Sequence, residues 1–380
     1  MRQLGRLLTA AAVAGLALAT APAAVASADQ QQDQGAHRVV FVQTNNPAGN
    51  QIIAYDRAGD GRLTPDRRYN TGGRGAVAAG AVVDPLASQN SLVYDGEHAL
   101  LFAANAGSNS LSAFAVDGDR LRLRQVVSSG DPFPVSVAVH DQLVYVLNAA
   151  GAGSVHGYRI DSGRLQPIEG SSRTLGLKNT NPPNFLMSPG QVGFTPDGDK
   201  LIVTTKASGN HIDVFAVRPD GRLSNAPVVN PSATPVPFAF TFDLAGRLVA
   251  SEAGTSSVTT YIVNADGSLT TDASLSDGQA AGCWIHAARG TYYVANTGSA
   301  NLSGFHVDAQ GHVSLVGTTG IVAATAGGPI DMAVAAGGRF LYLETAAAGT
   351  VYEFHVNADG TLTQIGTIAG ETGLEGIVAA

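Results

Sequence analysis

The sequence predicts an all-β protein: a seven-bladed β-propeller with four antiparallel strands per blade, closed by the C-terminal strand joining the first blade. Two observations lead to this prediction. The phrase aromatic-x-Val-Asn-Ala-Asp-Gly-x-Leu-Thr fills residues 261–270 and returns at residues 354–363. Looser copies of it occur five more times along the chain. Repeats of roughly 40 to 50 residues are typical of propellers and solenoids.

Each copy of the phrase is anchored by one aromatic residue, and neighbouring anchors are 44 to 59 residues apart. The anchors are Tyr55, Phe114, Tyr158, Phe215, Tyr261, Phe305 and Phe354. The two widest spacings carry insertions, at residues 66–90 and 169–191. Long irregular segments in a compact fold are often functional, and the alternative is that they are tolerated surface loops.

Each repeat holds further apolar runs before its anchor. One example is "RFLYLETAAAG" from Arg339, which follows "IDMAVAAGGR" from Ile330. Asp-Gly and Gly-Gly pairs between such runs predict tight two-residue hairpins. A repeat is therefore four antiparallel strands, and helical periodicity is not convincing outside the first residues.

The two ends of the repeat array complement each other. The chain enters it at "RVVFVQTNN" from Arg38, which reads as a second strand, and ends in "GLEGIVAA" from Gly373, which reads as a first strand. We therefore expect the C-terminal strand to complete the first blade, which removes exposed sheet edges. An open solenoid would need polar capping repeats, and neither end resembles one.

The first residues read as a secretory signal. Arg2 and Arg6 precede a short Ala-rich apolar run, and small residues stand at Ala26 and Ala28. This pattern predicts a signal peptide over 1–28, followed by a polar leader over 29–38 and the propeller domain over 39–380. The apolar run is too short for a comfortable bilayer span. We expect a secreted, extracellular protein without a membrane span.

Composition narrows the partners. Charged residues make up 14% of the chain and the formal net charge is −8, so no basic stripe suited to nucleic acid is expected. Cys283 is the only cysteine, which rules out an internal disulfide. A closed ring needs no second copy, so we expect a monomer.

In a propeller, the turns after the second strands gather at one rim. The residue at this point is polar in all seven repeats: Gln43, Asn105, Asn148, Lys206, Glu252, Asn296 and Glu344. We expect Glu252 or Glu344 to act as the general base, because crowded carboxylates raise one another's pKa. Lys206 would stabilise an oxyanion. Satisfying turn amides is the alternative role for any one of these residues.

Other polar residues of this rim are expected to bind substrate. They are Asn90, Gln191 and Asp331 at the starts of the innermost strands, with Asn105, Asn148 and Asn296 from the turns. Cys283 is not expected to be a nucleophile. His286 lies three residues away, on the opposite face of its strand, and aligns with a core valine, Val334. A structural histidine is the favoured interpretation.

No cofactor is expected. An oxygen-rich rim suits Ca²⁺, but the sequence has no Asp-x-Asp-x-Asp-Gly loop and no histidine cluster. A divalent ion in the channel is therefore only weakly supported.

Units such as "ALLFAANAGSNSLSAFAVDGDRL" and "FLYLETAAAGTVYEFHVNADGTL" resemble the seven-bladed propeller lactonases, which include the propeller-type 6-phosphogluconolactonases and the carboxymuconate cyclases. The resemblance covers residues 39–380. It implies hydrolysis of a sugar lactone at the rim by His, Arg and Glu side chains. Glu252 and Glu344 match the turn glutamate. The His and Arg places at the strand mouths hold Asn90, Ser136, Gln191, Cys283 and Asp331.

Two functions follow from the sequence. The first is a secreted hydrolase of an unphosphorylated lactone or related cyclic ester, since the rim offers Lys206 alone against three carboxylates and phosphate favours arginine clusters. The second is a non-catalytic extracellular propeller that binds a protein or a glycan.

Overall fold

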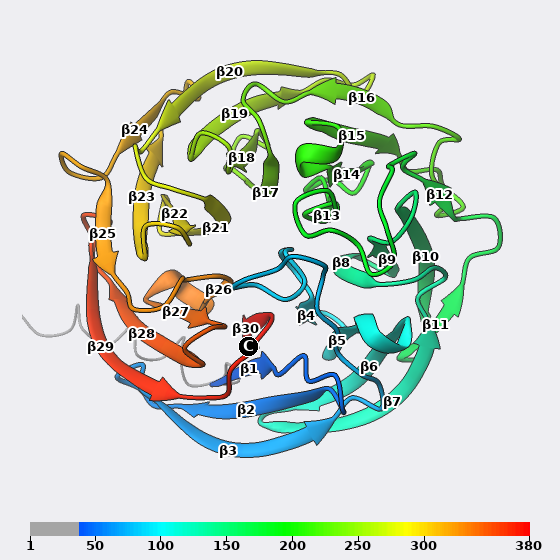
Figure 1. The fold of residues 1–380 in the computed structure, drawn as a ribbon, viewed down its shortest axis with the longest axis horizontal. Helices are drawn as coiled ribbons and strands as arrows, with labels where there is room; N and C mark the ends of the chain where they lie inside the picture. The colour runs from blue at the N-terminus through cyan, green and yellow to red at the C-terminus, as the bar shows by residue number, and fades with distance from the viewer. Residues whose placement is uncertain (1–37) are drawn as a thin grey trace, which may run out of the picture. The chain divides into compact units, whose positions relative to one another are not determined.

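A computed structural model describes residues 38–380, and these residues form a ring of seven antiparallel sheets (Figure 1). The predicted signal peptide and all but the last residue of the predicted leader lie outside the described residues. The predicted fold class is confirmed. In every blade but the first, the strands run in chain order from the inside of the ring to the outside.

The first three blades hold strands β1 to β12 and the last strand, β30. Blade 1 contains β30 (Ile377–Ala379), β1 (Val39–Gln43), β2 (Gln51–Arg57) and β3 (Leu63–Asn70). Blade 2 contains β4 (Leu92–Asp95), β5 (Leu100–Asn105), β6 (Ser110–Asp117) and β7 (Arg120–Ser128). Blade 3 contains β8 (Pro134–His140), β9 (Leu143–Asn148), β10 (Ser154–Asp161), β11 (Arg164–Pro167) and β12 (Arg173–Thr174).

The remaining four blades hold β13 to β29. Blade 4 contains β13 (Val192–Phe194), β14 (Lys200–Thr204), β15 (His211–Ala216) and β16 (Val228–Pro231). Blade 5 contains β17 (Pro237–Phe242), β18 (Leu248–Glu252), β19 (Ser257–Val263) and β20 (Leu269–Ser276). Blade 6 contains β21 (Gly282–Ala288), β22 (Thr291–Asn296), β23 (Asn301–Val307), β24 (Val313–Leu315) and β25 (Ile321–Ala324). Blade 7 contains β26 (Met332–Val334), β27 (Phe340–Thr345), β28 (Thr350–Val356) and β29 (Leu362–Ala369).

Three single-turn 3₁₀ helices complete the described elements: η1 (Ala106–Ser108), η2 (Lys206–Ser208) and η3 (Ala336–Gly338). No helix among residues 38–380 is long and apolar enough to cross a membrane.

The ring closes through its C-terminus. Strand β30 pairs antiparallel with β1, with Val42 opposite Ile377 and Val40 opposite Ala379. The last strand therefore supplies the innermost strand of blade 1, as the sequence predicts. Strand β30 therefore shares its sheet with strands from the start of the domain.

Each anchoring aromatic lies on the third strand of its blade and is at most 2% exposed. In blades 1, 2, 5 and 7 a β-bulge in the pairing with the outer strand coincides with the anchor. In blades 3 and 6 the outer strand is broken into two pieces at this level, β11 with β12 and β24 with β25. The repeated phrase therefore encodes packing and the bend of the outer edge.

Tyrosine side chains tie neighbouring blades together. Tyr145 donates a hydrogen bond to the carbonyl oxygen of Gly221 in the next blade, and Tyr293 donates to that of Gly360. Tyr342 of blade 7 donates to the carbonyl of Gly61 in blade 1 across the closure. Gly61 has φ +90°, and a Cβ there would lie 2.3 Å from the ring of Phe340, so this contact requires glycine.

Two-residue hairpins join Asp117 to Arg120 and Asp161 to Arg164, whereas the Asp-Gly turn of blade 5 is longer than the two residues expected from the sequence. In blade 5, Asn264 N–H bonds to the Ser268 carbonyl and Gly267 N–H to the Asn264 carbonyl, which leaves a three-residue loop. Gly267 takes φ +87°, and the Ser268 amide is capped by the Asp266 carboxylate at 2.9 Å. The Asp-Gly pair is thus used as a carboxylate cap followed by a left-handed glycine.

Candidate functional site

The first insertion enters the centre of the ring. We call residues 84–91 the plug. Ser88 donates its hydroxyl to the Val135 carbonyl in blade 3, and the Trp284 indole of blade 6 donates to the Ser88 carbonyl. Gln89 pairs its side-chain amide with both backbone groups of Ile285, at 3.0 and 3.2 Å. Contacts to separate blades fix the plug across the channel, where Figure 1 shows the segment before β4 inside the ring.

The plug separates two hollow regions. On one side lies the insertion cavity, lined by Val82, Val83, Asp84, Ala87, Phe185, Leu186, Lys206, Val236, Phe238, Ala253, Gly254, Ala281, Cys283, Trp284 and Thr297. On the other side lies the channel cavity, made of two adjoining spaces that share Asn90, Val93 and His286. Strand β21 shows the division: Cys283 and Trp284 face the first region, Ile285 and His286 the second.

The insertion cavity has a volume of about 440 Å³ and predominantly apolar walls. Val82, Val83, Asp84 and Ala87 come from the first insertion, Phe185 and Leu186 from the second, and the rest from blades 4 to 6. The two insertions therefore meet over one hollow, which gives both a common structural role.

Lys206 joins these insertions. Its ammonium group donates to the carbonyls of Ala87 (2.5 Å) and Phe185 (2.6 Å) and to the Ser188 hydroxyl (3.0 Å). The three ammonium hydrogens thus have three acceptors. Burial lowers the pKa of Lys206 to about 8, against the opposing attraction of Asp84. The side chain is 1% exposed, so it acts as a buried brace.

Two carboxyl groups lie next to each other here, that of Asp84 in the plug and that of Glu375 in the C-terminal segment. The Leu86 amide donates to Asp84 and to Glu375, each at 3.0 Å, and the Ser88 amide donates to Asp84 at 3.1 Å. Burial, repulsion from Asp84 and a hydrogen bond to it raise the pKa of Glu375 well above its usual range. A side-chain hydrogen bond between Glu375 and Asp84 links the plug to the C-terminal segment.

Glu344 is a third buried carboxyl group, and it interacts electrostatically with Glu375. Burial, followed by repulsion from Asp331, raises the pKa of Glu344 well above its ordinary value, although the Gly376 amide facing it works against this increase. Neither carboxyl oxygen has a hydrogen bond of normal geometry within residues 38–380. The group is fully buried and lines neither cavity.

The channel cavity is ringed by the innermost strands of all seven blades. Its two spaces measure about 270 and 230 Å³. Residues of β8, β13 and β17 line the first, those of β26 and β30 line the second, and β4 and β21 line both. Side chains far apart in the sequence are thereby brought to one opening.

His286 is the histidine of this cavity, which Tyr94 also lines. Its side chain is 27% exposed, and Nε2 lies 3.4 Å from Oδ1 of Asp331, which is 3% exposed. Nε2 is buried beside this carboxylate without a hydrogen bond to any described residue, which leaves Nδ1 as the other ring nitrogen. The contact places a carboxylate beside the imidazole ring without a hydrogen bond between them. The pair has the composition of a general base with its orienting acid.

An amide donor stands close to this pair. Asn90 has φ +68°, lines both parts of the channel cavity, and its side chain makes no hydrogen bond within the described chain. Gln191 also lines the cavity, but its amide is engaged with both backbone groups of Phe240, at 2.7 and 3.1 Å. Asn90 is therefore free to bind a ligand oxygen, whereas Gln191 holds two inner strands together.

Lys206, Glu252 and Glu344 do not meet at one opening. Lys206 lines the insertion cavity, while Glu252 and Glu344 are fully buried and line neither cavity. The cause is a one-residue offset between blades. Glu252 ends its strand opposite Ser257, but in blade 7 the residue at this point is Thr345, opposite Thr350. Because side chains alternate along a strand, Glu344 faces the other way from Glu252.

Glu252 accepts four hydroxyl groups of its own blade and the preceding segment. Thr234 and Thr259 donate to it at 2.6 Å each, and Ser232 and Tyr261 donate as well. A carboxylate saturated in this way has no lone pair directed at a cavity. It secures the turn between β18 and β19.

The expected substrate-binding asparagines of the turns have the same structural role. Asn105 donates to Ser112 at 2.8 Å and accepts from Asn50 and Thr71. Asn148 donates to the Ser129 carbonyl and Asn296 to Ser303, at 2.9 and 2.8 Å. All three are fully buried and line neither cavity, so the alternative of satisfying turn groups describes their contacts.

His286 corrects an expectation. It was placed in the core by alignment with Val334, yet both residues line the channel cavity. The sequence contained a sign of this position. When every second residue of an innermost strand packs between blades, the residues between them face the channel, and this applies to a polar residue at the third or later position of the strand. Asp84 and Glu375, which interact with each other at the plug, had no such signal in the sequence, since they lie outside the repeated phrase.

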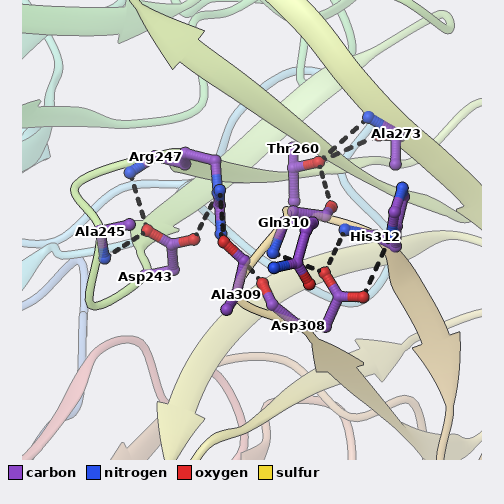
Figure 2. Close-up of polar contacts among 10 residues, drawn as sticks. Asp243, Ala245, Arg247, Thr260, Ala273, Asp308, Ala309, Gln310 and His312 are labelled. Carbon is purple, nitrogen blue, oxygen red and sulfur yellow. Dashed lines mark hydrogen bonds and ion pairs between the residues drawn. The ribbon is translucent and has the colours of Figure 1, made fainter.

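A second histidine–carboxylate pair shows what such a pair does when it is structural. At the outer edge, Arg247 of blade 5 binds Asp243 at 2.7 Å and the carbonyls of Asp308 and Ala309 in blade 6 (Figure 2). His312 Nδ1 lies 3.0 Å from the Asp308 carboxylate, and its side chain is 72% exposed. Arg247 joins the two blades, whereas the His312–Asp308 pair stays within one turn of blade 6 and lines neither cavity.

Among the described residues, one group of carboxylates is compact enough for a metal ion: Asp56, Asp66 and Asp119. Arg67 lies 3.1 Å from Asp66 and 3.8 Å from Asp119, so this surface group already has a cationic partner. None of these three aspartates lies on an innermost strand, and none lines either cavity.

No sequence-family model matches the chain, and no curated protein sequence is similar to it at a significant level. Solved structures do resemble it. A protein of Bacteroides fragilis, provisionally named a 6-phosphogluconolactonase, superposes with a TM-score of 0.71 at 16% identity, covering 90% of this chain and 98% of its own.

Two further structures agree. The periplasmic gluconolactonase of Pseudomonas aeruginosa has a TM-score of 0.69 at 19% identity, covering 90% of this chain and 99% of its own. A protein of Bacteroides uniformis, also provisionally named a 6-phosphogluconolactonase, has a TM-score of 0.68 at 17% identity, covering 89% and 98%. At these identities the likeness establishes the fold, and the chain is built on the seven-bladed propeller of the lactonases that its repeat units resemble.

Proposed function

We propose that the protein is an exported hydrolase of an unphosphorylated lactone or related cyclic ester, and that the reaction takes place in the channel cavity. The observation that carries this proposal is His286, which lines the channel cavity together with the unengaged amide of Asn90 and lies 3.4 Å from the carboxylate of Asp331. The shared fold with proteins named as lactonases supports the reaction class. The signal peptide predicted from the sequence and the periplasmic location named for one of those proteins support export.

The chemistry assigns one role to each residue. His286 Nδ1 takes a proton from water as the water oxygen attacks the lactone carbonyl carbon. The Asn90 amide donates to the oxygen that becomes negative. When the ring C–O bond breaks, the imidazolium returns the proton to the leaving alkoxide, and a hydroxy acid is released. Asp331 positions the ring and stabilises its charged form.

The cavity favours an uncharged substrate. Its described lining contains amides, Thr241 and His286, and no lysine or arginine. Phosphate recognition relies on such cations. We therefore propose that the substrate lacks a phosphate group.

The test is pH-stat titration of a panel of sugar and aliphatic lactones. We expect turnover by the wild-type chain and a loss of about 100-fold or more in His286→Asn, the usual contribution of a general base. His312→Asn is the matched control, because it removes a histidine from an exposed carboxylate pair, and it should retain full activity. Glu252→Gln should also remain active. Full activity of His286→Asn, or loss in Glu252→Gln without a change in folding, would overturn the proposed site.

A further inference from the structure

The insertion cavity is open at a rim built from two separate insertions. Val82 is 88% exposed and Leu186 is 41% exposed at this rim, and both line the cavity. Exposed apolar residues that border a hollow commonly mark a binding site. A volume of about 440 Å³ lies in the range of cavities that hold small ligands.

The polar groups in the wall are already paired. Lys206 has its three acceptors, the Trp284 indole N–H donates to the Ser88 carbonyl, and Asp84 accepts the amides of Leu86 and Ser88. The Cys283 thiol stays protonated, because burial raises its pKa to about 12. A ligand therefore meets no spare charge or strong hydrogen-bond donor, and a charged ligand would lose its hydration without compensation.

The shape of the cavity is fixed in advance. The Phe238 ring lies 4.6 Å from the Trp284 ring, centroid to centroid, and the Lys206 ammonium lies 5.1 Å from the centre of the Phe238 ring. Because Lys206 also ties Ala87 to Phe185, both insertions are held in place around an aromatic wall. A preformed cavity costs little ordering on binding.

We propose that the insertion cavity is a second binding site, distinct from the channel cavity, for an uncharged, largely apolar molecule that contains a ring. The ring lies against Phe238 and Trp284, and the rest of the molecule covers Val82 and Leu186. This site performs no covalent chemistry.

The sequence supplies its own reporter, because Trp284 is the only tryptophan. The probe is N-phenyl-1-naphthylamine, which is uncharged, and the comparison is 8-anilino-1-naphthalenesulfonate, which carries a sulfonate on similar rings. We expect saturable energy transfer from Trp284 to the neutral dye, and affinity weaker by about tenfold or more for the sulfonate. Equal affinities would overturn the chemical class, and no saturable transfer would overturn the site.

Two variants test the location. Ala253→Phe fills the cavity and should weaken the neutral dye by about tenfold or more, whereas Ala347→Phe, in the equivalent but exposed turn of blade 7, should not. Leu186→Asp alters only the rim and should also weaken the dye, which keeps the test decisive if Ala253→Phe folds poorly. Unchanged binding in Leu186→Asp and in a folded Ala253→Phe would overturn the location. Lactone hydrolysis should persist in all three, so this test is independent of the proposed reaction.

Discussion

The two sides of the plug differ in how their polar groups are used. In the insertion cavity, Lys206 and Asp84 are bound to the plug and its neighbours, and the thiol of Cys283 is held neutral. In the channel cavity, His286 and Asn90 keep atoms available. A cavity lined by ionisable residues is therefore not by itself a reactive site. What matters is whether the hydrogen-bonding groups of those residues are already bonded within the protein.

The largest expected effect is slow alkylation of Cys283, and its absence would contradict this comparison. Burial raises the pKa of Cys283 to about 12, so at pH 8 iodoacetamide should alkylate this thiol about 1,000-fold more slowly than free cysteine, because only the thiolate reacts. Mass spectrometry of the intact protein measures the rate. The urea-unfolded chain is the control and should react normally. Rapid alkylation of the folded protein would mean that the insertion cavity contains a nucleophile, and the two cavities would then not differ in reactivity.

The variant Asp331→Asn tests the comparison between the two cavities at the channel cavity. We expect kcat on the hydrolysed lactone to fall about 100-fold with little change in KM, because the variant loses the charge that stabilises the imidazolium. The acidic limb of the pH–rate profile should also move to lower pH, a change that a structural role alone would not cause.

Asp308→Asn is the matched control for this carboxylate, since it removes the partner of His312 at the outer edge. It should leave both kcat and the pH profile unchanged. A normal profile with reduced activity in Asp331→Asn would mean that this carboxylate supports the fold and does not act through His286.

The smallest effect concerns Glu344, between the two cavities. Burial raises its folded-state pKa above the ordinary value of 4.5. Stability from its protonated form is therefore complete below pH 4.5 and is lost as pH rises toward the folded pKa. Glu344→Gln should match the wild type near pH 4 and become more stable above it, by up to about 1.4 kcal/mol for each pH unit.

Urea unfolding at several pH values measures this difference. Glu169→Gln, an exposed glutamate in the second insertion, should show no such trend. Parallel stability curves for wild type and Glu344→Gln would show that Glu344 is charged in the folded protein.

The repeated phrase was sufficient for the fold but not for the site. Its anchors and turns predicted seven blades and closure by β30, because packing between blades places the same demand on every repeat. The turns at the rim differ in register from blade to blade, so residues at matching places in the repeated phrase do not occupy matching places in the structure. Thr345 and not Glu344 occupies the turn position in blade 7, and a shift of one residue reverses the direction of a side chain.

Sequence alone therefore determined the strand order, the number of blades and their buried aromatics, since these follow from local alternation and a regular period. The tertiary structure decided the path of the first insertion through the ring, the bracing of both insertions by Lys206, and the meeting of His286 with Asp331 and Asn90. These depend on contacts between residues tens to hundreds of positions apart, outside the repeat, where no local pattern specifies a partner.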